Sequence, residues 1–205
     1  MDTLNRKKER RGDRALLDEI LDEAHVATVS TVVDGLPWSV PMLIARHGDT
    51  ILLHGSTGAG ALRHIAAGAP VAISAFVVDG LVVADTLFDH SMNYRSAVVR
   101  GTIENSGVDA REALNVLGDS ILPGRSAEVR PHTGKEIAAT IVLSLPIIDG
   151  QWITKARAGG PGTETSDEWT GHIPIRTVYD APVTATEGPI PQSVRRLSTE
   201  SALTT

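Results

Sequence analysis

Short β-type segments joined by tight turns are the feature that most restricts the fold of this chain. Residues 25–33 are rich in Val and Thr and lead into Asp34-Gly35. This dipeptide is typical of a two-residue hairpin turn, because both central positions of a type I′ turn need a positive φ. Two more strand-like segments follow at 37–46 and 50–54, separated by His47-Gly48-Asp49. Three strands joined in this way form an antiparallel meander rather than a βαβ unit.

The rest of the sequence continues this mixture of β-type segments and short helices. Apolar residues at helical spacing predict helices over 13–24, 59–67 and 108–122, with Asp13 as the first N-cap. Further strands are predicted over 70–78, 81–86, 94–104, 138–148 and 152–157. Asp79-Gly80 is predicted to be the turn between the first two of these, and the last is predicted to pair with the one before it. Six or seven strands must close or be covered to protect their edges, which predicts a mainly β fold, a small β-barrel with flanking helices.

One domain with two extensions is the organisation that a length of 205 residues favours. Residues 1–12 are predicted to be a basic, flexible arm, and residues 13–176 to form the barrel domain. Residues 177–205 carry prolines at positions 182, 189 and 191, which predicts an extended C-terminal arm.

Composition excludes several classes of chemistry. The chain has no cysteine, so thiolate metal sites, Fe–S clusters, disulfides and cysteine nucleophiles are ruled out. Its seven histidines include no His-x-x-x-His pair and no His-Glu-x-x-His motif, so no metal site is expected. The sequence also lacks the Gly-x-Ser-x-Gly elbow of a serine hydrolase.

Charge and hydropathy bear on partners and location. The net charge of −6 argues against nucleic acid binding. The basic residues between Arg6 and Arg14 have no aromatic residues among them to stack on bases. No apolar run is long enough to cross a bilayer, and no apolar signal core follows Met1. A cytoplasmic protein with no membrane contact is therefore expected.

The segment 54–63 is the strongest candidate for a binding site. Its glycines have the spacing of a P-loop, but Ala61-Leu62 stands where Lys and Ser or Thr are required, and the dinucleotide fingerprint fails as well. What remains is a strand end, a loop of small residues and a helix start. Its N–H groups and the hydroxyls of Ser56 and Thr57 suit one phosphate monoester, with Arg63 as countercharge. The alternative is that Ser56 or Thr57 only caps the helix.

Three stretches of the sequence together resemble one family. They are Gly35-Leu-Pro-Trp-Ser-Val-Pro-Met-Leu-Ile44, Leu53-His-Gly-Ser-Thr-Gly58 through Leu62-Arg63, and His90-Ser-Met-Asn-Tyr-Arg-Ser-Ala-Val-Val-Arg-Gly101. Further matches lie at 123–131, 136–140 and 169–174. The combination resembles the FMN-binding split-barrel proteins similar to pyridoxamine 5′-phosphate oxidase, in the branch that includes nitroimidazole-resistance reductases. The resemblance covers about residues 13 to 195.

The resemblance implies a flavin-reductase-like split β-barrel and a homodimer with an FMN in each of two clefts between the subunits. It implies that the isoalloxazine lies along the strand that contains Ser39, Val40, Pro41 and Met42. It implies that the ribityl phosphate is bound by His54, Gly55, Ser56, Thr57 and Arg63. Ser96, on the strand that begins at Tyr94, would lie nearest the ring, and Trp169 would close the cleft from the partner subunit. Such a slot needs few catalytic side chains, because the redox chemistry belongs to the cofactor.

The activity implied is that of a flavoprotein oxidoreductase acting on a small planar or nitroaromatic substrate. His90 and Tyr94 are the candidates for substrate contact or proton transfer. One departure from the family pattern concerns the cofactor: Ala59-Gly60 occupies positions where a Ser-Arg pair is typical at the start of the phosphate-binding helix. Loss of that arginine predicts weakened FMN binding or another cofactor in its place, such as the deazaflavin F420.

Two further functions stay open. One is a haem-binding or haem-degrading split barrel in which His54 or His90 ligates the iron. The other is a non-catalytic binding or regulatory dimer that has lost flavin, which the missing phosphate-side arginine and the basic residues before Arg14 motivate.

Overall fold

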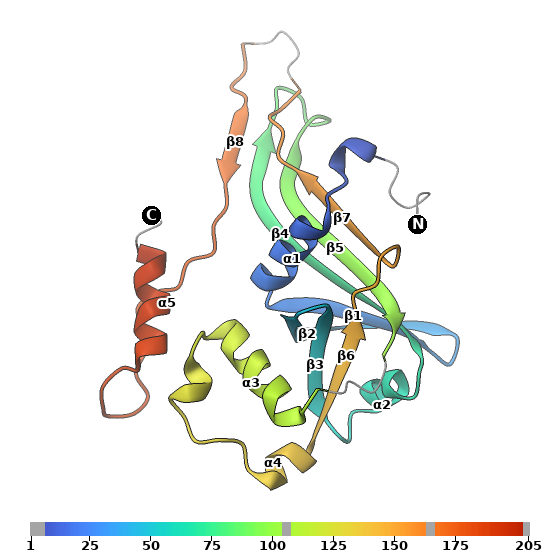
Figure 1. Ribbon diagram of the computed structural model, residues 1–205. Coiled ribbons are helices and arrows are strands. Elements are labelled where there is room, and N and C mark those ends of the chain that lie inside the picture. Colours follow the sequence, from blue (N-terminus) through green and yellow to red (C-terminus); the bar gives the residue numbers. More distant parts are fainter. Residues whose placement is uncertain (1–6, 104–107, 163–166, 203–205) are drawn as a thin grey trace.

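The computed structural model describes residues 7–103, 108–162 and 167–202, which Figure 1 shows as a curled sheet with helices around it. Eight antiparallel strands lie in this part of the chain, in the order β6-β3-β2-β1-β4-β5-β7, with β8 beside β4. The strands are β1 (Val26–Val33), β2 (Leu36–His47), β3 (Thr50–Ser56), β4 (Pro70–Val83), β5 (Ser91–Thr102), β6 (Thr140–Pro146), β7 (Trp152–Arg157) and β8 (Gly171–Pro174). The helices are α1 (Arg14–Glu23), α2 (Gly60–Ala66), α3 (Ala110–Ile121), α4 (Gly134–Ala138) and α5 (Gln192–Ala202), with short 3-10 helices η2 (Lys8–Arg10) and η3 (Arg125–Ala127). The predicted mainly β fold with flanking helices is confirmed.

Strand β2 divides its pairing between two neighbours. Its residues 36–43 pair with β1 across the Asp34-Gly35 turn, whereas 44–47 pair with β3. Both turn residues have positive φ, 51° and 77°, as the predicted type I′ hairpin requires. Strand β3 then continues past this point along β6. The sheet consequently separates into two halves that are joined through β2 (Figure 1).

Two apolar cores lie on opposite faces of the β2–β3 region. The main core combines inward side chains of the sheet, such as Leu53 and Ile73, with the apolar faces of α1 and α2. The second core lies where α3 packs Leu117 against Ala45 and Leu52. Successive side chains of a strand point to opposite faces, so the same two strands serve both cores.

Asp79-Gly80 is not a hairpin turn, and the prediction of two separate strands around it is wrong. Strand β4 continues through this dipeptide, and its register with β5 shifts between Val78 and Gly80, which makes it a β-bulge. The glycine is needed because a Cβ at position 80 would lie 2.8 Å from the carbonyl oxygen of Ile173 in β8. The dipeptide therefore marks the close approach of a third strand, which local turn propensity does not reveal.

Two strand pairings also differ from the sequence prediction. Strand β7, predicted beside the preceding strand β6, instead pairs with β5 from Tyr94↔Arg157 to Val99↔Trp152. Strand β8 was not predicted, and it pairs with residues 80–83 of β4, on the edge that β1 leaves after Ser74. Both pairings depend on how the sheet curls, and sequence neighbours alone do not determine them.

The two ends of the chain pack on the barrel in different ways. Residues 1–6 of the predicted basic arm lie outside the described residues, and Arg11 forms an isolated β-bridge with Lys155. The predicted extended C-terminal arm holds from Thr177 to Pro191, but α5 then follows and corrects that prediction. Glu128 fixes the start of α5, since its carboxylate accepts from the N–H (2.9 Å) and the hydroxyl (2.5 Å) of Ser193. An acceptor this distant in sequence is not visible in the local pattern.

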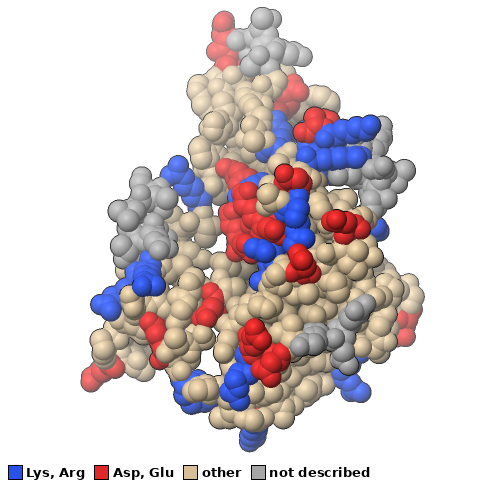
Figure 2. All heavy atoms as spheres, in the orientation of Figure 1, with Lys and Arg blue, Asp and Glu red and all other residues tan. Residues whose placement is uncertain are grey.

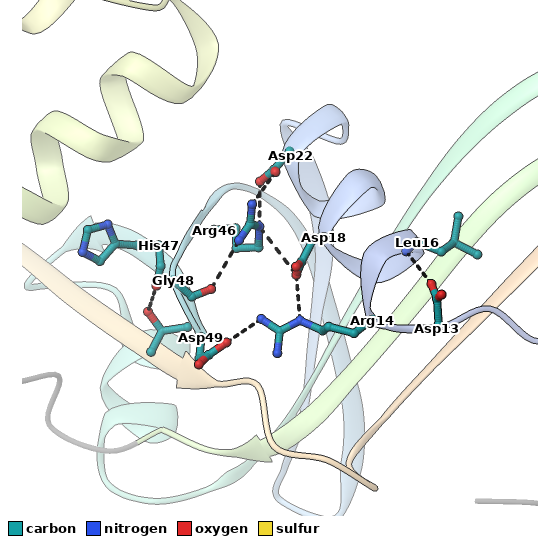
Figure 3. Close-up of polar contacts among 10 residues, drawn as sticks. Asp13, Arg14, Leu16, Asp18, Asp22, Arg46, His47, Gly48 and Asp49 are labelled. Carbon is teal, nitrogen blue, oxygen red and sulfur yellow. Dashed lines mark hydrogen bonds and ion pairs between the residues drawn. The ribbon is translucent and has the colours of Figure 1, made fainter.

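Helix α1 is tied to the turn between β2 and β3, as Figure 3 shows. Asp13 accepts from the N–H of Leu16 at 3.1 Å, which confirms the predicted N-cap. Arg14 donates to Asp49 in the turn at 2.6 Å, and Arg46 of β2 donates back to the acidic face of α1. The helix is therefore fixed on one side of the sheet at its first and last turns.

A second group of ion pairs fixes α1 over the other half-sheet. Arg95 of β5 donates to Asp79 at 2.7 Å and to Glu19 and Glu23 at 2.6 Å each, with only 17% of its side chain exposed. Hydrogen bonds to Asp79 and Glu23 raise the pKa of the Arg95 guanidinium, so it stays charged. Figure 2 shows acidic side chains gathered over the middle of this face, where α1 lies. Arg95 is the countercharge that lets three of the carboxylates lie close together.

Replacing Arg95 with Met is expected to lower the free energy of unfolding by about 1–3 kcal/mol, because three carboxylates lose a partly buried partner while the apolar stem is kept. Arg130→Met is a matched control, since its pair with Glu136 is exposed and exposed ion pairs contribute little to stability. Urea unfolding measures both variants. Equal losses in the two would contradict the role given to Arg95.

Candidate functional site

The separation of β2 from β3 leaves one edge of each strand without a strand partner among the described residues. Beyond Ile44, no described strand pairs with the β3-facing edge of β2, which includes Ser39 to Met42. Beyond Leu53, β3 pairs only with β6, so His54 to Ser56 present their other edge without a strand partner in the described residues. Free backbone donors and acceptors on two such edges can bind the polar rim of a flat ligand.

The four predicted β2 residues divide between the faces of the sheet. Val40 and Met42 pair with Val29 and Ala27 of β1, which are buried, so they point inward. Ser39 and Pro41 point outward and are exposed, and the Ser39 hydroxyl lies 2.7 Å from that of Ser30. The strand therefore offers a ligand its backbone edge and, on the outer face, one hydroxyl.

The loop after β3 uses its own hydrogen-bonding groups internally. The Ser56 hydroxyl accepts from the N–H of Gly58 at 3.2 Å, the N–H of Thr57 donates to the carbonyl of Ala139 at 3.1 Å, and that of Ala59 donates to the Ser56 carbonyl. The N-cap of α2 is Ala59 and no side chain caps it, so the alternative that Ser56 or Thr57 caps the helix is wrong. Few donors of this loop are left for a phosphate.

Glycines and one arginine determine what else the loop can offer. Gly55 is required because an added Cβ would lie 2.3 Å from the side chain of Leu62, which packs α2 onto β3. An added Cβ at Gly60 meets nothing within 4 Å, so the start of α2 has open space beside it. Arg63 is the one Lys or Arg in the segment from His54 to Ala66, and its side chain is exposed.

His54 has an unusual environment for a polar side chain. It lies on the face of β3 that carries Leu52, opposite Val142 of β6, and its Nδ1 is buried without a hydrogen-bond partner. Burial lowers the pKa of His54 below its ordinary value. The neutral imidazole that results is a potential hydrogen-bonding partner or metal ligand with an unused nitrogen.

Of the remaining predicted site residues, Ser96 lies near the middle of β5, whereas His90 and Trp169 lie at the other end of the sheet. Tyr94 and Ser96 point outward from β5, opposite Val78 and Phe76 of β4. His90 lies in the turn between β4 and β5, and Trp169 lies just before β8, with its ring packed over Gly171. In Figure 1 this turn is at the top of the molecule, whereas β3 and α2 are at the bottom.

One chain therefore does not bring all the predicted residues together. The β4–β5 ladder has its Pro70↔Thr102 rung at one end and Val82↔Ser91 at the other. Twelve residues of β-strand span about 40 Å. His54, Ser56, Thr57 and Arg63 belong to the first end, and His90, Tyr94 and Trp169 to the second.

Sequence reasoning missed a hollow on the outer face of the sheet. It has a volume of about 650 Å³ and lies where β1, β4 and β5 meet the end that carries α2. Val32, Pro37, Pro70 and Ala72 give it apolar walls, and Arg100 projects beside it. The outward register of β5 places Arg100 on the same face as Ser96, and this alternation is the signal that could have found it.

Among the described residues, no group of His, Asp or Glu side chains is arranged to hold a metal ion. In the same part of the chain, every helix is too short or too polar to span a lipid bilayer.

A family profile decides the identity of this barrel. The profile of pyridoxamine 5′-phosphate oxidase matches residues 13–150. The chain belongs to this family. A comparison with curated protein sequences gave no match.

Solved structures agree with the family. The FAD and haem binding protein from Mycobacterium smegmatis is 40% identical with a TM-score of 0.87, and the match covers 92% of this chain and 97% of that one. The flavocytochrome from Azotobacter vinelandii is 27% identical with a TM-score of 0.80, and the match covers 90% of each chain. A protein from Bacteroides thetaiotaomicron, titled as a 5-nitroimidazole antibiotic resistance protein, is 21% identical with a TM-score of 0.58 over 70% of this chain and 83% of that one, and it supports the fold alone. The split-barrel fold that the resemblance implied is confirmed.

The lowered pKa of His54 predicts a contribution to the pH dependence of stability. Below about pH 6.5 the His54 imidazole becomes protonated in the unfolded chain, whereas in the folded chain it is protonated only at a lower pH. The free energy of unfolding should therefore fall as the pH decreases, and His54→Gln should flatten this slope. Urea unfolding at several pH values measures it, with His172→Gln, at an exposed position, as control. An unchanged slope in His54→Gln would contradict the prediction.

Proposed function

We propose that this chain is a flavin-dependent oxidoreductase whose complete site forms between two copies in a homodimer. The observation that carries this proposal is the pair of open edges at Ser39–Met42 and His54–Ser56, in a chain 40% identical to an FAD and haem binding protein. The separation of His90 and Trp169 from these edges supports a second copy, because a two-fold axis that lies between two facing sheets and runs across their strands brings opposite ends of the two sheets together.

The residues at and beside these open edges fit a flavin. Backbone groups of β2 from Ser39 to Met42 can pair with the polar edge of the isoalloxazine, and the partly buried Met42 supplies apolar contact. Arg63 is the countercharge for phosphate, and the open space beside Gly60 admits it. A bound flavin supplies the hydride and electron transfer. The protein then has to bind and orient it, and His90 and Tyr94 of the second copy are the proposed groups for substrate contact or proton transfer.

Among flavins, we expect FAD to bind more tightly than FMN. The N–H groups of Thr57, Gly58 and Ala59 are already bonded within the protein, and Arg63 is the sole cation of the segment. A flavin whose affinity depends on one phosphate monoester is therefore poorly held, whereas FAD adds the contacts of its adenylate. A small planar substrate, with nitroaromatic compounds among the candidates, remains the proposed class.

Restoring the Ser-Arg pair that is typical of the family at the start of the phosphate-binding helix tests this expectation. Ala59→Ser/Gly60→Arg should tighten FMN binding about 10- to 100-fold, since one new Arg–phosphate contact is worth roughly 1.5–3 kcal/mol. It should change FAD binding less. Fluorescence titration of the apoprotein measures both flavins, and Gly134→Arg, another glycine with open space around it, is the control.

The wild-type protein should be yellow as purified, and light scattering after gel filtration should give twice the mass of one chain. Colourless protein that binds neither flavin would contradict the proposed function. Flavin-binding protein of single-chain mass would contradict only the homodimer.

Haem binding is a second candidate function, favoured by the similarity to the haem-containing proteins and by the geometry of His90. Its Nδ1 lies 2.7 Å from the carbonyl oxygen of Thr86. A hydrogen on Nδ1 donates to that carbonyl, which leaves Nε2 as the ligating nitrogen and fixes the ring orientation. The side chain is exposed, so a large ligand can reach it. Haem at this position would supply one-electron chemistry.

Reconstitution with haemin distinguishes the two histidines. The wild type with haemin is expected to show a Soret absorbance band of histidine-ligated haem. His90→Ala is expected to abolish this band, and His54→Ala is expected to keep it. The ferric electron paramagnetic resonance spectrum gives a readout independent of activity. A spectrum that survives His90→Ala and is lost in His54→Ala would reverse the assignment.

A further inference from the structure

The turn between β4 and β5 carries two large apolar side chains in solvent. Leu87 is 89% exposed and Phe88 is 94% exposed. The turn itself is fixed from within: the Thr86 hydroxyl donates to the carboxylate of Asp89 at 2.8 Å, and the Thr86 carbonyl accepts from the N–H of Asp89. The neighbouring His90 ring binds the same carbonyl. The chain therefore holds two apolar side chains outward on a rigid turn, here called the apolar finger (Leu87 and Phe88).

No described residue covers the apolar finger, and exposed apolar residues on an ordered element usually mark a contact surface. At the opposite end of the same sheet is the hollow of about 650 Å³ with Val32, Pro37 and Ala72 in its walls. The finger and the hollow thus lie at the two ends of the β4–β5 ladder, about 40 Å apart, and cannot meet within one chain.

The outer sheet face between the finger and the hollow can pack against the same face of a second copy. Several neighbouring outward positions carry small side chains, which are Thr28, Ser30, Ser39, Ala72, Ser74 and Ser96. Small residues let two sheets approach closely, and Phe76, 64% exposed, lies near the middle of this face. A two-fold axis that lies between the two facing sheets near Phe76, parallel to the sheet plane and perpendicular to β4 and β5, places the finger end of one chain over the hollow end of the other.

Charge supports the same match. The finger is followed directly by Asp89, whose side chain is partly exposed, whereas both carboxylate oxygens of Asp85 are buried and take no part in this match. The hollow has Arg100 at its rim, and no side-chain ion pair or hydrogen bond of Arg100 is found within the described residues. An acidic finger therefore faces a basic hollow in this arrangement.

We propose that the apolar finger of each protomer inserts into the hollow of a second copy of this chain, twice in a two-fold dimer. The inference rests on the homodimer proposed above and not on which cofactor is bound. It gives His90 and Tyr94 a role in trans, because the finger carries them to the end of the partner where the edges at Ser39–Met42 and His54–Ser56 lie open. The finger is then the element that completes each site.

Engineered cysteines test the contact directly, because the chain has none of its own. Phe88→Cys/Val32→Cys places one cysteine on the finger and one at the rim of the hollow. Under mild oxidation it should form a covalent dimer, visible on a non-reducing gel. Phe88→Cys alone, and Phe88→Cys/Val183→Cys with the 97% exposed Val183, are the controls and should stay monomeric on the gel.

A charge substitution tests the energetic role. Leu87→Asp/Phe88→Asp should weaken the dimer at least about tenfold in analytical ultracentrifugation, as loss of a central apolar contact does. Val183→Asp is the matched control and should leave the dimer unchanged. Circular dichroism should match the wild type, because both finger residues are exposed in the single chain.

The outcomes separate the proposals. A dimer that neither cross-links through the cysteine pair nor weakens with the aspartates overturns the finger contact but leaves the homodimer standing. A wild-type protein of single-chain mass overturns both, while flavin titration tests the cofactor by itself. Flotation of the wild type with phosphatidylcholine vesicles, lost in Leu87→Asp/Phe88→Asp with the dimer intact, would assign the finger to a membrane surface and overturn the inference.

Discussion

The change of partner along β2 is the constraint on which the rest of the structure depends. Its residues 36–43 are bonded to β1 on one edge, and 44–47 are bonded to β3 on the other. A strand that passes from one half-sheet to the other in this way leaves its remaining edge without a strand partner in the described part of the chain. Such an edge carries backbone groups that need partners, and a polar planar ligand can satisfy them. The proposed binding site thus follows from the pairing geometry more than from any reactive side chain.

The same geometry explains why the site needs material from elsewhere. The loop after β3 directs much of its hydrogen bonding inward, to Ser56 and to the carbonyl of Ala139, and Arg63 is its single basic residue. His90 and Trp169 lie at the far end of the β4–β5 ladder. In the proposed homodimer, each protomer would offer half of a slot at each end, and the symmetric pair would combine the halves. Two-fold symmetry would thus bring together residues that one chain holds far apart.

The sequence predicted a turn or a helix start correctly where residues next to it in the chain determine its conformation. The φ values of Asp34 and Gly35, and the capping of α1 by Asp13, follow from the residues themselves. The mainly β class and the family also followed from short motifs. Asp79-Gly80 was misread because its glycine serves the approach of β8, a strand some ninety residues later in the chain, and that contact leaves no trace in a turn pattern. Helix α5 was missed for a similar reason, since its start is fixed by Glu128.

The candidate site was predicted less completely than the fold. His54 and the loop after it were found from residue types, but the buried Nδ1 of His54 and the internal use of Ser56 depend on neighbours that only the folded sheet brings close. Arg100 and the apolar finger escaped notice because single exposed residues carry no pattern. They gain meaning only from the face and the end of the sheet on which they lie.

Strand β8 gives the tail a protective role for the whole sheet. Where β1 departs, residues 80–83 of β4 would present a bare edge containing Leu81 and Val82, and β8 closes this edge with four paired residues. An uncovered edge of this kind recruits strands from other molecules and leads to aggregation. We expect a shortened chain ending before Gly171 to keep the open edges at Ser39–Met42 and His54–Ser56 and still to be poorly soluble. The boundary of the working unit is therefore set by edge protection, well beyond the last residue of the family match.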